Sequence, residues 1–159
     1  MHAKKICLIL LLLAMATFCI AYVWTLTSTS TTPKVQFIKF SDETLYNTID
    51  LHYDVYPDMW TQGSNATYGI RNTDTSDHTV YLYIDAIDQT SKVANVTIWI
   101  KSLDGTTNKA TITWQGGSLP TTEQSFSASA NTKYMMKVWI KGASSALGEL
   151  VISLRLKSH

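Results

Sequence analysis

Apolar and polar residues alternate along several separate stretches of this chain. Between Ile49 and Val55, for example, the apolar positions alternate with Asp50, His52 and Asp54. Alternation with a period of two is typical of a β-strand that buries one face and exposes the other. The same pattern recurs at residues 80–86, 96–101, 110–114, 134–141 and 150–157. Because helical periodicity is nearly absent after Leu26, the sequence predicts an all-β protein.

Turn-forming residues separate these stretches. Asp104-Gly105 lies between two of them and predicts a β-hairpin. Shorter strands are expected at residues 35–40, 68–71 and 124–127. About eight or nine short strands with regular turns predict a single jelly-roll-like β-sandwich. We assign this domain to residues 34–159.

The N-terminal part of the chain has a different character. The run from Ile6 to Val23 is almost entirely apolar and follows Lys4 and Lys5. This layout is typical of a secretory signal peptide or a signal-anchor, and the run is about as long as a membrane-spanning helix requires. We expect residues 1–21 to be the leader, cleaved after Ala21. The positive flank sends the remainder outside, so we expect an extracellular protein of the cell surface that contacts the membrane only through its precursor.

Composition excludes several classes of function. Both cysteines, Cys7 and Cys19, lie in the leader, so the mature chain has neither a disulfide nor a catalytic cysteine. The formal net charge is only +1, which leaves no electrostatic footprint for nucleic acid, and we expect no nucleic-acid partner. The four histidines form no H-E-x-x-H arrangement, and nucleophile-elbow, P-loop and dinucleotide motifs are missing. We therefore expect no catalytic residues, no metal, no cofactor and no enzymatic activity.

The segment at residues 22–33 is expected to be an extension ahead of the sandwich. In an extended conformation Tyr22, Trp24 and Leu26 share one face. No turn joins this segment to a neighbouring strand, so three outcomes remain open. It frays, it pairs with its own sheet, or it adds to the sheet edge of another molecule.

Two features mark the surface of the predicted sandwich. The sequons Asn65-Ala66-Thr67 and Asn95-Val96-Thr97 make Asn65 and Asn95 candidate glycosylation sites. Four aromatic residues fall on the polar sides of their strands, where they form a covered face, an assembly surface or a platform for carbohydrate stacking. These residues are Tyr81, Tyr83, Trp99 and Trp139.

Several segments resemble TasA/camelysin-type secreted proteins. Val35–Glu43 and Asn47–Leu51 are similar to the aromatic-Phe-Ser-Asp segment and the following T-L-D-L-like strand of that family. Gly69–Thr73 and Tyr134–Lys141 fit later parts of the same outline. Similar jelly-roll subunits form bundling pili in archaea. The resemblance implies a cell-surface jelly roll that polymerises by donor-strand complementation, in which each N-terminal segment completes the sheet of the next subunit.

The leading hypothesis from the sequence is therefore a structural subunit of an extracellular filament, either a pilus or a biofilm matrix fibre. Its partner is a second copy of itself, joined head to tail, with Trp24 and Leu26 inserted into the neighbour. The alternative is a membrane-anchored β-sandwich in which residues 6–26 remain as a transmembrane helix. That domain binds a ligand such as carbohydrate through its loops and exposed aromatic residues.

Overall fold

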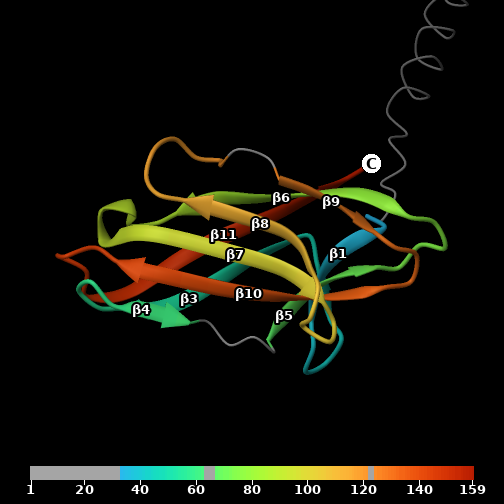
Figure 1. Cartoon of the computed structure of the whole chain (residues 1–159), viewed down its shortest axis with the longest axis horizontal. Coiled ribbons are helices and arrows are strands. Elements are labelled where there is room, and N and C mark those ends of the chain that lie inside the picture. The colour runs from blue at the N-terminus through green and yellow to red at the C-terminus, as the bar shows by residue number, and fades with distance from the viewer. Residues whose placement is uncertain (1–32, 63–66, 122–123) are drawn as a thin grey trace, which may run out of the picture. The chain divides into compact units, whose positions relative to one another are not determined.

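The computed structural model describes residues 33–62, 67–121 and 124–159. Residues Pro33–His159 form one compact unit. Two antiparallel sheets pack face to face in it, which confirms the predicted β-sandwich (Figure 1). Among the described residues, no helix is long and apolar enough to cross a membrane. The expected leader, at residues 1–21, lies outside the described residues.

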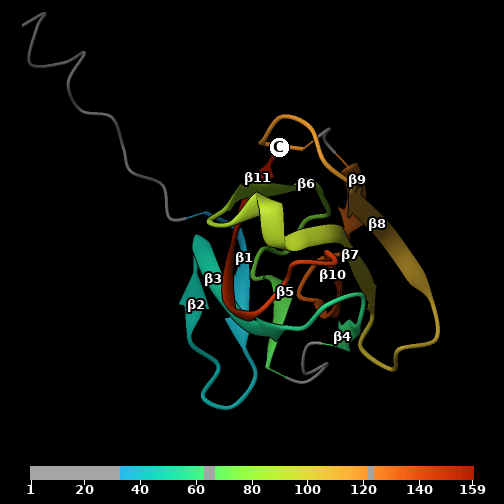
Figure 2. The same cartoon turned by 90° about the vertical axis from the view of Figure 1, so that its left-hand side faces the viewer.

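The larger sheet has seven strands in the order β2-β1-β5-β10-β7-β8, with β4 paired to β10. Strands β2 and β8 lie at its opposite edges (Figure 2). Both β4 and β5 pair with β10, β5 along its first part and β4 along its last part. The bounds of these strands are Val35–Lys39 for β1, Leu45–Tyr46 for β2, Trp60–Gln62 for β4, Tyr68–Asn72 for β5, Val93–Ser102 for β7, Asn108–Trp114 for β8 and Lys133–Gly142 for β10.

The smaller sheet has four strands in the order β3-β11-β6-β9. They are β3 (Thr48–Val55), β6 (His78–Ile87), β9 (Gln124–Ala128) and β11 (Gly148–Ser158). One turn of 3₁₀-helix, Thr90–Lys92, leads from β6 into β7. The chain crosses repeatedly from one sheet to the other, so each sheet collects strands from distant parts of the sequence.

The core lies between the sheets and is built from the inward positions of the alternating strands. In β10 the buried positions are Tyr134, Met136, Val138 and Ile140, every second residue. In the facing sheet, β11 contributes its own alternate set of aliphatic residues: Leu150, Ile152 and Leu154. Burying each large aliphatic side chain contributes roughly 1.5–3 kcal/mol, so these positions fix which side of every strand faces inward.

All nine expected strands are present, and so is the expected hairpin. In the turn between β7 and β8, Ser102 N–H donates to Thr107 O at 2.8 Å, and Gly105 has a positive φ of 76°. A left-handed conformation of this kind favours glycine. Two short strands, β2 and β4, were not expected, because neither is long enough to show alternation.

One buried polar residue ties the end of the sandwich together. Asn72, the last residue of β5, is fully buried. Its Nδ2 donates to the carbonyls of Ser76, Ala128 and Ser129 at 2.8, 2.9 and 3.1 Å. Its Oδ1 accepts from Asp74 N–H at 2.9 Å. The amide thus satisfies groups on two separate connections between strands, at a place where buried carbonyls need partners.

We predict that Asn72→Asp strongly destabilises the fold. The substitution keeps the shape but replaces a donor with a carboxylate oxygen that faces three carbonyls. Unsatisfied buried groups cost about 1–3 kcal/mol each, so the free energy of unfolding should fall by at least about 3 kcal/mol in urea titrations. The matched control is Asn47→Asp. Asn47 is exposed and its Oδ1 only accepts, from Gln36 Nε2, so this variant should unfold close to the wild type. Similar losses for both variants would contradict this role of Asn72.

Candidate ligand-binding face

The outer surface of the larger sheet carries the most concentrated aromatic cluster of the described residues. Because Val138 and Ile140 of β10 point inward, Trp139 between them points outward. The same alternation in β7 turns Trp99 outward between Ile98 and Ile100. Strands β4, β10 and β7 lie side by side (Figure 1). In their register Trp60 pairs with Lys141 and Trp99 pairs with Lys137, so the tryptophans of the three strands follow a diagonal across the sheet.

Two indole rings on this surface contact a third, that of Trp139. Trp60 of β4 and Trp139 of β10 have ring centroids 6.0 Å apart, at an interplanar angle of 63°. Trp99 of β7 lies on the other side of Trp139, also at 6.0 Å, at an angle of 87°. Edge-to-face contacts of this kind are favourable and hold the rings in a defined arrangement. Trp60 remains 50 % exposed, so the cluster is open to a ligand.

A shallow cavity of about 210 Å³ lies within this cluster. Its lining is Gln62, Trp99, Lys101, Lys137 and Trp139. Two aromatic rings therefore stand beside an amide and two ammonium groups. Aromatic surface and convergent polar groups are both found in ligand sites. We call Trp60, Trp99 and Trp139, together with Gln62, Lys101 and Lys137, the tryptophan face.

The charged groups around the tryptophan face differ in their pairing. Glu43 forms ion pairs with Lys133 and, at 3.3 Å, with Arg71. The hydrogen bond from Lys133, with the charges of both cations, holds the pKa of Glu43 below its ordinary value. In contrast, no ion pair among the described residues involves Lys101 or Lys137.

The four aromatic residues predicted on polar strand faces do point outward, but on two different sheets. Trp99 and Trp139 belong to the larger sheet, whereas Tyr81 and Tyr83 belong to β6 of the smaller sheet. Tyr81 contacts the ring of His159 at 5.5 Å, and the Arg155 guanidinium lies 4.7 Å from the Tyr83 ring centroid. Because the outer faces of a two-layer sandwich are on opposite sides, the four residues do not form one surface.

The remaining predicted sites are placed only in part. Asn95 lies on β7 with its side chain outward, and Thr97 Oγ1 donates to its Oδ1 at 2.9 Å. Thr97 is paired in register with Trp139, so this sequon borders the tryptophan face. The other sequon residue, Asn65, lies outside the described residues, as do the expected donor-strand residues Tyr22, Trp24 and Leu26.

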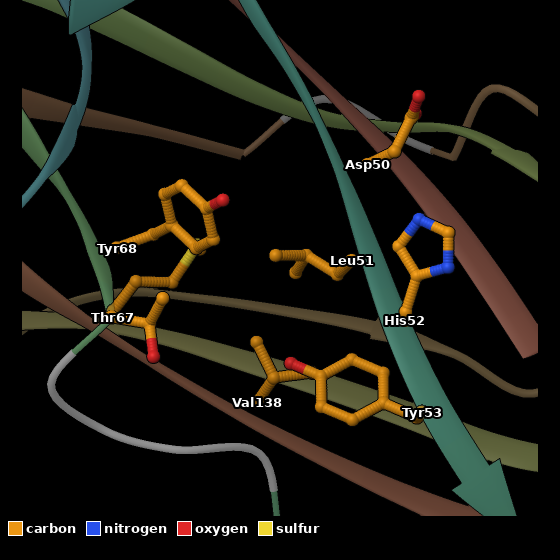
Figure 3. Close-up of a pocket in the computed structure, with 8 residues that line it drawn as sticks. Asp50, Leu51, His52, Tyr53, Thr67, Tyr68 and Val138 are labelled. Carbon is orange, nitrogen blue, oxygen red and sulfur yellow. The ribbon is translucent and has the colours of Figure 1, made fainter. Parts of the chain in front are cut away.

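A second cavity, of about 260 Å³, opens between the two sheets beside β3. Leu51 and Tyr53 of β3 point into it toward Tyr68 and Val138, while Asp50 and His52 lie on the other side of the strand (Figure 3). Burial raises the pKa of Tyr53 to about 12. Leu51, Met136 and Val138 give the cavity an apolar part, and Tyr53, Thr67 and Tyr68 add hydroxyl groups to its lining.

The described part of the chain has no cluster of side chains suited to bind a metal ion. Within residues 33–62, 67–121 and 124–159, no group of three His, Cys, Asp or Glu side chains could hold an ion. His52 and His78, the two histidines considered from the sequence, contact different carboxylates: His52 Nδ1 lies 2.6 Å from Glu149 Oε1, and His78 Nε2 lies 2.8 Å from Asp74 Oδ2.

No protein-family model matches this chain, and no curated protein matches it. Among solved structures, the chain is similar to an arabinose-bound α-L-arabinofuranosidase, MgGH51, with 17% identity, a TM-score of 0.33, and coverage of 69% of this chain and 19% of that one. It is also similar to the CBM22-1 and GH10 modules of a Clostridium thermocellum xylanase complexed with xylohexaose, with 10% identity, a TM-score of 0.29, and coverage of 76% and 26%. The third similar structure is from carbohydrate-binding modules of the β-sandwich superfamily, with 6% identity, a TM-score of 0.27, and coverage of 83% of this chain and 59% of that one. The chain thus spans less than two thirds of each of these proteins, and the likeness is one of partial fold.

The sequence pointed to two members of the tryptophan face and missed the others. Trp60 and Gln62 lie on β4, a three-residue strand with no detectable alternation. Lys101 and Lys137 were visible as outward residues, but only the pairing of β7 with β10 brings them to one cavity. A long-range strand pairing of this kind leaves no local signal in the sequence.

Proposed function

We propose that this protein is a carbohydrate-binding β-sandwich that holds its ligand on the tryptophan face. The observation that carries the proposal is that Trp139 contacts both Trp60 and Trp99 on one outer surface, beside a cavity that Trp99 and Trp139 line together with polar groups. Sugar rings combine apolar C–H faces with many hydroxyl groups. They therefore suit a site that offers both aromatic surface and hydrogen-bonding side chains.

The composition of the face favours a glycan over a protein partner. Aromatic residues are common at the centres of protein–protein interfaces, but lysine is depleted there. In the tryptophan face, Lys101 and Lys137 line the same cavity as the indole rings. A lysine ammonium can donate three hydrogen bonds, and the Gln62 amide both donates and accepts, which suits hydroxyl-rich ligands.

The size of the cavity indicates how such a ligand would lie. At about 210 Å³ it is smaller than the range of roughly 300–1,000 Å³ that is usual for small-molecule sites. The cavity would hold part of a polysaccharide, and the neighbouring sugar units would continue over the exposed ring of Trp60. We therefore propose a polysaccharide rather than a free monosaccharide. The extracellular location expected from the N-terminal run is part of this proposal, since polysaccharides are abundant at cell surfaces.

The sequence hypothesis of a filament subunit is the second candidate, and one observation favours it. Strand β3 pairs with β11 on one side and is an edge of the smaller sheet. Apart from the hydrogen bond that Thr61 Oγ1 donates to Asp54 O at 3.1 Å, the described side chains make no hydrogen bond to the backbone of this edge. Leu51 and Tyr53 border the 260 Å³ cavity next to it. An eight-residue edge strand beside a cavity partly lined by apolar side chains could accept a donated strand.

Trp60→Ala and Trp139→Ala should each weaken binding of the mature protein to its polysaccharide by at least about tenfold, which corresponds to about 1.4 kcal/mol. Affinity electrophoresis in gels that contain single polysaccharides, followed by calorimetry, measures the change. Trp60 lies on a short strand attached only at β10, so its removal leaves the core intact even if Trp139→Ala unfolds. The matched control is Tyr81→Ala on the opposite sheet. Unchanged binding by the folded Trp60→Ala variant would contradict the proposal.

For the filament candidate, a mature chain that lacks residues 22–32 should remain monomeric. A peptide with the sequence of residues 22–32 should then raise its Tm, because a ligand that binds only the folded state stabilises it. The peptide should also slow amide hydrogen exchange in β3. A scrambled peptide is the control. Filaments that form normally from the truncated chain would rule out donation of this segment.

A further inference from the structure

The charged residues of the sandwich are divided between its two sheets. The described strands of the larger sheet contain no aspartate or glutamate. The smaller sheet has only Arg155 and Lys157 as strand cations, and its four strand carboxylates are Asp50, Asp54, Asp85 and Glu149. The strand cations of the larger sheet are Lys39, Arg71, Lys101, Lys109, Lys133, Lys137 and Lys141.

Part of this positive charge is neutralised within the chain, but the part at the tryptophan face is not. Glu43 pairs with Arg71 and Lys133, and Asp42 pairs with Lys39 at 3.4 Å. The carboxylate of Asp104 is occupied in its own turn, where it accepts from Thr106 N–H at 3.0 Å. For Lys101 and Lys137, the described residues supply no partner carboxylate.

The two lysines are also close to each other. In the β7–β10 ladder Lys137 pairs with Trp99, and Lys101 pairs with Met135, so the two cations are diagonal neighbours on one face. Both line the cavity between Trp99 and Trp139. Like charges side by side repel each other, and a bound anion would remove that repulsion. The position of the charge inside an aromatic cavity distinguishes it from solvated lysines elsewhere.

We propose that the ligand of the tryptophan face is an acidic glycan, whose anionic groups pair with Lys101 and Lys137 while its sugar rings contact Trp60, Trp99 and Trp139. This inference rests on the carbohydrate-binding function proposed above. Carboxylate and sulfate groups share the required chemistry, since both accept charge-assisted hydrogen bonds from ammonium groups. Charge on the outer face of the larger sheet would also steer a polyanion to this side of the molecule and away from the acidic outer face of the smaller sheet.

The test uses the mature protein and matched probes. A uronic-acid oligosaccharide is compared with its fully methyl-esterified form, which has the same rings without the charge. A sulfated oligosaccharide forms the second acidic arm and separates sulfate from carboxylate recognition. Oligo(dT) of equal charge serves as a polyanion without pyranose rings. Calorimetry at about 50 mM and about 500 mM NaCl measures the electrostatic part of the binding.

The uronic-acid oligosaccharide should bind ten or more times tighter than its esterified form, or the sulfated oligosaccharide should bind ten or more times tighter than oligo(dT). The double variant Lys101→Ala/Lys137→Ala should lose about tenfold or more of this affinity, together with most of the salt dependence. The control is Lys92→Ala/Lys157→Ala, which removes the same charge away from the tryptophan face and should bind like the wild type. Thermal melts of each variant confirm folding.

The outcomes separate the inference from the function on which it rests. If the esterified and acidic forms bind equally well and Trp60→Ala loses this binding, the proposal of an acidic ligand is overturned. The proposal of carbohydrate binding then stands. Binding of oligo(dT) as tight as the acidic sugar would overturn the glycan assignment in favour of nucleic acid or another polyanion. Binding of none of the probes would overturn both proposals. An effect of the control double variant equal to that of Lys101→Ala/Lys137→Ala would assign the affinity to net charge, and would overturn the role of the two lysines.

Discussion

The antiparallel pairing of β7 with β10 is the constraint on which the rest of the structure depends. It runs in continuous register from Tyr134 with Ser102 to Lys141 with Asn95. A shift of one residue in either strand would turn its buried aliphatic side chains to solvent and its tryptophan into the core. Each buried aliphatic side chain contributes roughly 1.5–3 kcal/mol, and the shift would sacrifice several at once. The hydrophobic core therefore also determines the composition of the outer face, and the candidate site is a consequence of how the core packs.

Most of the strands could be predicted because each carries its own signal. Alternation over five or more residues identified β3, β6, β7, β8, β10 and β11, and the Asp-Gly turn identified the hairpin. The strands β2 and β4 are too short for such a signal, and they form because β1 and β10 already present edges to them. The same limit explains why Trp60 was missed, although it completes the aromatic cluster.

The grouping of side chains was harder to predict than the strands themselves. Alternation shows that Tyr81, Tyr83, Trp99 and Trp139 point outward, but it does not show that β6 and β10 belong to different sheets. The sheet assignment divides these residues between two faces. It also separates the basic strands from the acidic strands, which a net charge of +1 conceals. The role of Asn72 was equally hard to predict, because its buried amide hydrogen-bonds to a residue 57 positions away in the chain. Properties of this kind arise from long-range pairing and appear only in the folded molecule.

The five tryptophans of the chain offer the most direct measurement of the central claim, which is that the outer face of the larger sheet binds carbohydrate. Their indole N–H signals can be followed by NMR while an acidic oligosaccharide is added to the mature protein. The account predicts that the signals of Trp60, Trp99 and Trp139 shift together and saturably, whereas that of Trp114, whose Nε1 is buried in the core, stays in place. Shifts confined to residues around the cavity beside β3, or no shift of these three signals with any glycan, would contradict it.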